Sequence, residues 1–487
     1  MRKDFCLLAY TVCIGIALVA GGCNDWLDVK PKSQAESEEL FSREQGFKDA
    51  LTACYIKMNS TSLYGMELMV SSIEYMAQFW DFTNNNDRNA KLFKDFDYSS
   101  SLVESTFKSI YSNFYNTIVQ ANSVLENLQL HGEVIENEKL RKMIEAEALG
   151  IRAFCHFDIL RLFGQLPQNA TIHVQLPYAK TVGVETIPYY TFDDYVGLVL
   201  DDINKAQNLF KECDPVLDYP FAELNAASGV GLEDSYMGYR RFRFNYWAME
   251  ALKARLYLYI GNKEKAYTAA HNVIDAKTNS GQIVIDLVRS KDFYSECILA
   301  LSNNEIKDIK NDILNGTLSS TSNFMTAANY GKLFSGKVTT DDFRAKDFWA
   351  ETVSNGSYTY YEFVKYKQPE DNIVNNSEEW MIRYQVIPLI RLSEMYLIVM
   401  ETAELTEANK LYKSYMAEKN ALITTDMARE ELNAEILNEY RREFWGEGQM
   451  FYAYKRLGVK EMMWKTDREV EEKDYIVPLP TTESGSN

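Results

Sequence analysis

The strongest constraint on the fold is a run of apolar residues at helical spacing in the first third of the chain. Its members are three or four positions apart: Leu140, Ile144, Ala148, Ile151, Cys155, Ile159 and Leu162. This spacing places all of them on one face of a single long helix, and other helices must cover that face. Gly164 and Pro167 then end the helix. The chain is therefore expected to consist of long helices packed against one another.

A second helical feature, between residues 246 and 276, has the pattern of a helical hairpin. Small and aromatic residues occupy the packing positions of tetratricopeptide repeats: Ala254, Tyr257, Gly261, Ala266, Ala270 and Val273. A weaker match runs from Ile390 to Tyr415. We predict a mainly all-α fold, a tetratricopeptide-like helical-repeat α-solenoid with long irregular loop insertions and a few short strands.

Four regions lack helical periodicity and are expected to be insertions on the ligand side of this scaffold. They are rich in Asn, Asp, Gly, Ser and Thr, and they span residues 77–101, 164–190, 212–243 and 277–387. Loops of this length are usually either functional or poorly ordered. One short strand is predicted at Thr359–Val364. We predict that residues 41–487 form a single domain.

The N-terminus has the pattern of a lipoprotein export signal. Two basic residues precede an apolar stretch, Phe5–Ala20, which is too short to span a bilayer. Two glycines then precede Cys23, as in a bacterial lipobox, where the cysteine is acylated and becomes the first mature residue. We predict removal of residues 1–22, a covalent lipid on Cys23, and a polar, extended tether over residues 23–40. The alternative is a secreted protein in which Cys23 is incidental.

Charge and motif content exclude several function classes. The chain has 51 Lys and Arg against 70 Asp and Glu, a net charge of -19, and such a surface repels nucleic-acid phosphates. The four histidines and the scattered cysteines lack metal-site spacing. No nucleophile elbow or dinucleotide fingerprint is present. We predict no catalytic residue, no metal and no cofactor.

Several separated segments resemble the SusD/RagB family of nutrient-uptake lipoproteins. They follow the family's order along the chain: Arg152–Gly164, Lys253–Gly261, Asp342–Arg344, Pro388–Glu394, Tyr440–Gly458 and Pro478–Pro480. The segment from Tyr440 contains RREFWGEG and is the most specific of them. One departure from the family pattern is Tyr454, which stands where the family usually has Asp.

The resemblance implies a cell-surface binding protein without enzymatic activity. Members of the family capture oligomeric nutrients and pass them to a SusC-like TonB-dependent transporter in the outer membrane. Asp25 and Asp28, close to Cys23, resemble the acidic export signal of surface lipoproteins. We therefore predict a lipid-anchored outer-membrane protein that faces the extracellular side. Two alternative functions come from other classes of protein, namely a surface adhesin and a hydrolase.

The charged residues of the family-like segments have a structural interpretation. Because they lie on amphipathic helices, we expect them to form buried or half-buried ion pairs and not to contact the ligand. These residues are Arg152, Arg161, Arg441, Arg442 and Glu443.

Ligand contacts are instead expected from the insertions. An aromatic ring stacks on the apolar face of a sugar, while amides and carboxylates bond its hydroxyls. The segment Phe79–Arg88 offers both types, and its predicted contacts are Trp80, Asp81, Phe82, Asn84, Asn85 and Asn86. Weaker candidates are Phe324, Tyr330 and Trp349. An oligosaccharide is the predicted ligand. An oligopeptide is the alternative, because an Asn-rich wall can also pair with a peptide backbone.

Overall fold

A computed structural model provides the structure of most of the chain. It describes residues 37–80, 88–183, 186–225, 230–287, 293–303, 306, 324–334, 341–354, 358–366, 385–465 and 467–481. The predictions for the signal sequence, Cys23 and most of the tether lie outside these ranges. So do the predictions for Asp81, Phe82, Asn84, Asn85 and Asn86.

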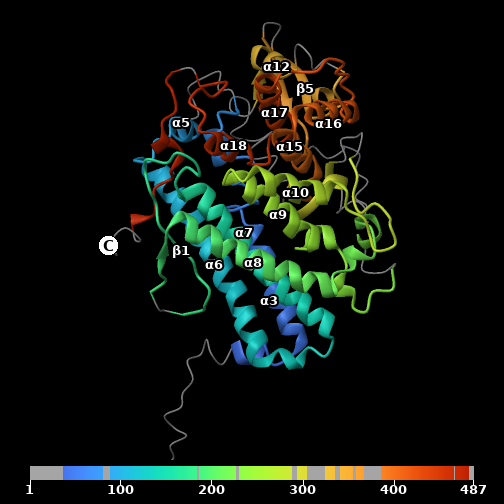
Figure 1. Cartoon of the computed structure of the whole chain (residues 1–487). Coiled ribbons are helices and arrows are strands. Elements are labelled where there is room, and N and C mark those ends of the chain that lie inside the picture. The colour runs from blue at the N-terminus through green and yellow to red at the C-terminus, as the bar shows by residue number, and fades with distance from the viewer. Residues whose placement is uncertain are drawn as a thin grey trace, which may run out of the picture.

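Four helices build the N-terminal half of the molecule: α3 (Glu44–Met58), α6 (Ser101–His131), α7 (Glu138–Phe163) and α8 (Phe192–Cys213). α7 packs against both α6 and α8, and it is buried along most of its length (Figure 1). Asn137 caps its start by accepting from the Leu140 N–H at 3.1 Å, and Gly164 follows its last residue. The long helix predicted from apolar spacing is confirmed.

Two helical hairpins continue the scaffold. The first is α9 (Tyr246–Tyr259) with α10 (Lys263–Ile274), and the second is α15 (Leu392–Thr402) with α16 (Leu405–Glu418). Gly261 makes the first turn with a φ of +81°, a backbone conformation that favours glycine. Because α10 packs on α15, the hairpins stack as predicted for a tetratricopeptide-like solenoid.

Short strands and helices complete the fold. Two-stranded antiparallel pairs are formed by β1 (Leu176–Pro177) with β2 (Tyr189–Tyr190), and by β3 (Cys297–Ser302) with β7 (Val386–Arg391). A three-stranded sheet has the order β4 (Phe324–Thr326), β6 (Tyr358–Phe363), β5 (Trp349–Ser354). Further helices are α4 (Ser72–Met76), α5 (Arg88–Lys94), α12 (Ala327–Leu333), α13 (Phe343–Asp347), α17 (Arg429–Glu443) and α18 (Met450–Leu457). The sheet and α12 lie at the opposite end of the molecule from α3 (Figure 1).

Some boundaries differ from the expectation. The strand predicted at Thr359–Val364 is confirmed as β6, but the insertion at 77–101 contains the helix α5. Residues 37–40 form a helical turn and are not extended. Burial of Phe41 against Phe47, with ring centroids 4.8 Å apart, holds the start of the chain close to α3.

A buried charge cluster joins the elements of the C-terminal half. Its residues are Glu296, Asp342, Arg344, Lys365, Arg391, Lys419, Glu439, Glu443 and Glu447, all nearly inaccessible to solvent. Arg344 Nη1 lies 2.7 Å from Glu439 Oε2 and 2.9 Å from Glu443 Oε2, and its Nη2 lies 2.6 Å from Asp342 Oδ2. Arg391 Nη1 donates to the other Glu443 oxygen at 2.6 Å.

Glu443 shows how the cluster offsets the cost of burial. Burial alone raises the pKa of its carboxyl, but Lys419, Arg391 and Arg344 outweigh that effect and lower the pKa well below its usual range. Glu443 therefore stays ionised inside the protein. Each charge is tolerated there because its opposite charges are in direct contact.

The predicted ion-pairing role of the family-like residues is largely confirmed. Arg152 Nη2 lies 2.6 Å from Asp202 Oδ1, and Arg161 Nη2 lies 2.5 Å from Asp158 Oδ1. Arg442 pairs with Glu435 and Glu439. Arg441 differs, because it donates to the Tyr454 hydroxyl at 2.9 Å and to the Asn438 side-chain carbonyl at 2.5 Å.

Replacement of Arg344 by Met tests the cluster. Arg344→Met leaves Asp342, Glu439 and Glu443 short of a cation, so we expect the free energy of unfolding to fall by about 3–5 kcal/mol. Urea denaturation followed by far-UV circular dichroism measures it. Lys346→Met, on the same helix but largely exposed, is the matched control and should change stability by less than about 0.5 kcal/mol. An equal change in the free energy of unfolding for Arg344→Met and Lys346→Met would contradict the role of the cluster. Arg344→Lys keeps the charge, so its loss of stability should lie between those of the two Met variants.

Candidate functional site

The structure places Trp80 in the core and not on a ligand surface. Its side chain has no exposed area, and its ring packs edge-on against Trp445 and Phe363 at centroid distances of 5.5 and 5.7 Å. The indole N–H donates to the Val70 carbonyl at 3.3 Å. The prediction that Trp80 stacks on a ligand is therefore wrong, because other aromatic rings already cover it.

Trp349 belongs to the same aromatic cluster, and the prediction that it contacts the ligand is wrong for the same reason. It is 3% exposed, and its ring lies 5.0 Å from Trp445 and 5.1 Å from Phe363. Phe79 stacks on Trp445 at a centroid distance of 3.9 Å with an interplanar angle of 8°. Trp445 is thus the centre of a packed core that joins the segment around Trp80 to the β5–β6 strands.

A buried carboxylate fixes the chain next to Trp445. The backbone N–H groups of Gly446 and Gly448 donate to the two oxygens of Glu74 at 3.1 and 2.9 Å. Both glycines have positive φ, and a Cβ at Gly448 would lie 1.9 Å from the Leu68 carbonyl oxygen. Burial raises the pKa of the Glu74 carboxyl to about 8, with the two N–H donors opposing that shift.

Tyr330 keeps some accessible surface, unlike the two tryptophans. It stacks on Tyr361 at 3.7 Å with an interplanar angle of 5°, and its hydroxyl donates to the Ala345 carbonyl at 2.8 Å. Its prediction as a ligand contact stays open. Phe324 lies in β4 opposite Glu362 of β6.

A large cavity lies elsewhere, between the segment after α7, helix α17, the end of α18 and the segment around residues 469–475. Its volume is about 790 Å³. Neutral amides, charged side chains and aliphatic groups line it: Leu166, Gln168, Asn169, Thr171, Lys263, Glu401, Asn433, Ile436, Leu437, Tyr440, Arg456, Leu457, Gly458, Lys460, Glu469, Val470, Glu471, Glu472 and Tyr475. No residue of this cavity was predicted as a ligand contact.

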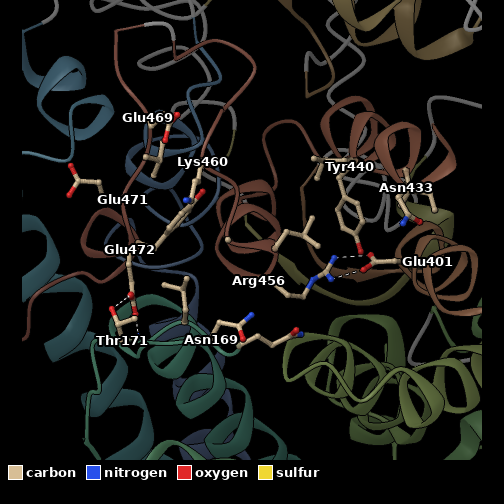
Figure 2. Close-up of a pocket in the computed structure, with 18 of the residues that line it drawn as sticks. Asn169, Thr171, Glu401, Asn433, Tyr440, Arg456, Lys460, Glu469, Glu471 and Glu472 are labelled. Atoms are coloured by element: carbon tan, nitrogen blue, oxygen red, sulfur yellow. Dashed lines mark hydrogen bonds and ion pairs between the residues drawn. The ribbon is translucent and has the colours of Figure 1, made fainter. Parts of the chain in front are cut away.

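One side of the cavity is organised by a bidentate ion pair (Figure 2). The two terminal nitrogens of Arg456 donate to the two oxygens of Glu401 at 2.6 and 2.8 Å. Tyr440 and Asn433 stand next to this pair. Burial lowers the pKa of Arg456, but Glu401 outweighs it, so the pKa is raised and the guanidinium stays charged.

The opposite side consists of the segment that follows α18. Glu472 accepts hydrogen bonds from the Thr171 and Ile172 N–H groups at 2.8 and 3.0 Å, which ties this segment to the one after α7. Lys460 and Glu469 stand above it in the same view (Figure 2). The two sides together offer hydrogen-bond donors and acceptors to the cavity. They also offer an apolar group, Leu457, which is 46% exposed. Such a wall can bind a ligand rich in hydroxyl groups.

Comparison with known proteins gives a partial family match. Residues 25–213 match a family model described as SusD-like, starch-binding and associating with the outer membrane. Over this part, the chain is similar to the SusD-like family. Two curated SusD-like relatives, P25 and P38 of Formosa agariphila, are 22% and 23% identical over 63% and 56% of this chain. These matches cover 54% and 46% of the relatives, so the chain spans about half the length of each.

Solved structures share the SusD-like fold over almost the whole chain. A SusD superfamily protein from Bacteroides thetaiotaomicron has a TM-score of 0.69 at 19% identity, over 91% of this chain and 98% of its own. A SusD-like carbohydrate binding protein from Bacteroides vulgatus has a TM-score of 0.66 at 17% identity, over 91% and 96%. A laminarin binding SusD-like protein has a TM-score of 0.64 at 18% identity, over 91% and 98%.

Two further observations concern only the described part of the chain. No helix in it is long and apolar enough to cross a membrane. Within the same ranges, no three His, Cys, Asp or Glu side chains are grouped as a metal site.

Replacement of Glu74 by Gln gives a pH-dependent prediction. The folded carboxyl keeps its proton up to about pH 8, whereas the unfolded one loses it near 4.5, so unfolding releases a proton between these values. Glu74 therefore stabilises the fold below pH 4.5, and this contribution is lost as the pH rises to 8. We expect it to amount to at most about 5 kcal/mol. Urea denaturation at several pH values should show this decline in the wild type but not in Glu74→Gln.

The control for this experiment is Glu104→Gln, an exposed carboxylate on α6, which should keep the wild-type pH profile. Parallel pH profiles for the wild type and Glu74→Gln would contradict the raised pKa.

Proposed function

We propose that this protein binds oligosaccharides at the cell surface and passes them to a SusC-like TonB-dependent transporter. The observation that carries the proposal is the family match over residues 25–213, whose description names starch binding and the outer membrane. A structural neighbour that binds laminarin supports a carbohydrate ligand.

The proposal includes a lipid anchor at Cys23. The apolar run before Gly21, Gly22 and Cys23 supports cleavage after residue 22 and acylation of the cysteine. Two or more acyl chains would hold a protein stably on a membrane. Asp25 and Asp28 support a position on the extracellular face. No transmembrane segment is then needed to keep the protein beside its transporter.

We propose a binding role without catalysis. A glycosidase would need two carboxyl groups placed across the scissile bond, with one free to donate a proton. In the cavity, Glu401 is held by Arg456, and Glu472 accepts from two backbone N–H groups. Of the four glutamates that line the cavity, these two thus have structural partners, which supports a role of the wall in recognition.

We place the oligosaccharide in the cavity beside Tyr440. Its volume of about 790 Å³ lies within the range of small-molecule sites. The side-chain amides of Gln168, Asn169 and Asn433 can each donate to one sugar hydroxyl and accept from another. Leu457 offers an apolar surface to the face of a sugar ring.

An oligopeptide is the second candidate ligand, and the three-stranded sheet favours it. Within the described residues, β4 and β5 are the edge strands of the order β4–β6–β5. An edge strand can pair with the backbone of an extended peptide.

Calorimetric titration of the mature chain with two ligand panels tests the proposed function. One panel contains glycan oligomers, and the other contains peptides of about 6–12 residues, a length that an extended cleft would bind. We expect saturable heat with a glycan class. Asn433→Ala removes an amide from the cavity and should weaken that binding about 5- to 10-fold. Asn208→Ala, at an exposed helical asparagine on α8, is the matched control and should leave the affinity unchanged.

Other results of the titration would each lead to a different conclusion. Heat with peptides alone would contradict the carbohydrate proposal and favour the edge-strand alternative. Glycan binding that is weakened by Tyr361→Ala but not by Asn433→Ala would move the site to the stacked tyrosine pair. No heat with either panel would contradict ligand capture by this chain.

A further inference from the structure

A small polar cavity lies directly behind one wall of the large one. It has a volume of about 30 Å³ and is lined by side chains from α7, α9, α15, α17 and α18. Tyr440 and Arg456 line both cavities, so the two spaces share this part of their walls. A space of this size can hold one monatomic ion or one or two water molecules.

Three buried polar atoms among its lining residues have no hydrogen-bond partner. They are Nη1 of Arg255 and the hydroxyls of Tyr259 and Tyr452, whose side chains are 5%, 2% and 4% exposed. The rest of the Arg255 guanidinium is fully used, because Nε and Nη2 donate to Glu394 at 2.7 and 2.6 Å. Buried polar groups are rarely left unpaired, so an occupant is needed here.

The hydrogen-bond donors indicate what the occupant is. Three guanidinium groups line the cavity, from Arg161, Arg255 and Arg456, and each is paired with one carboxylate, Asp158, Glu394 and Glu401 respectively. Each of the three unpaired groups can donate a hydrogen bond. An anion can accept from all three, whereas a water molecule has two lone pairs and accepts from two at most.

We propose that this cavity is a binding site for a single halide-sized anion, chloride under ordinary conditions. The ion would accept from Arg255 Nη1 and from the hydroxyls of Tyr259 and Tyr452. These donors come from α9 and α18, so the ion would join the first helical hairpin to the C-terminal helices. It would also support the side of Arg456 that faces away from Glu401 and so stabilise one wall of the large cavity.

Anomalous diffraction from crystals of the mature chain grown in sodium bromide tests the proposal directly. We expect a bromide peak within hydrogen-bonding distance of the three donors. In solution, the melting temperature should be about 1–3 °C higher in sodium chloride than in sodium gluconate at equal ionic strength, because only chloride fits the cavity.

Matched variants separate this site from a general effect of salt. Tyr259→Phe and Tyr452→Phe each remove one donor and should reduce or abolish the chloride-dependent shift. Tyr412→Phe removes another buried hydroxyl without a partner, outside this cavity, and should retain the shift. Water density without an anomalous peak, together with equal melting temperatures in the two salts, would overturn the proposal. The bromide measurement needs no variant, so it stands even if a Tyr→Phe protein folds poorly.

Discussion

The carboxylate of Glu443 is the point at which the C-terminal half of the molecule is joined. Arg344 of α13, Arg391 of β7 and Lys419, which follows α16, approach it from separate elements. Buried charges destabilise a protein unless every one of them is compensated, so this arrangement tolerates few alternative packings. It therefore fixes α17, and the chain that follows α17 leads to both the Trp445 core and the large cavity.

The long helices could be predicted because their signals are local. The apolar spacing from Leu140 to Leu162 and the turn at Gly261 depend only on neighbouring residues, and both are confirmed. The cap of α8 is equally local, since Thr191 accepts from the Asp194 N–H three residues later. Helix periodicity and capping require no knowledge of the tertiary structure.

The site could not be predicted in the same way. Trp80 stands in a polar, Asn-rich stretch, which is typical of an exposed loop, yet Trp445 and Phe363 cover it. The large cavity combines the segment after α7 with residues from α15, α17 and α18. Leu166, Glu401 and Glu472 are far apart in the sequence, and only the folded chain brings them to one cavity. Their residue types alone do not indicate a binding site, because polar residues are common throughout the chain.

The surroundings of Tyr454, which departs from the family pattern, are clear from its contacts. Its hydroxyl accepts a hydrogen bond from Arg441 Nε at 2.9 Å. The Asn438 side-chain carbonyl adds a second acceptor for Arg441 at 2.5 Å. The buried guanidinium of Arg441 thus donates to two neutral acceptors.

We propose that a helical scaffold fixed by buried charges serves as the surface partner of an outer-membrane transporter. The most direct test is affinity purification of the full-length protein, tagged at the C-terminus, from detergent-solubilised outer membranes of its native host. The account predicts that a TonB-dependent β-barrel protein co-purifies in about equal amount. Recovery of the tagged protein alone, from membranes that contain such a transporter, would contradict it.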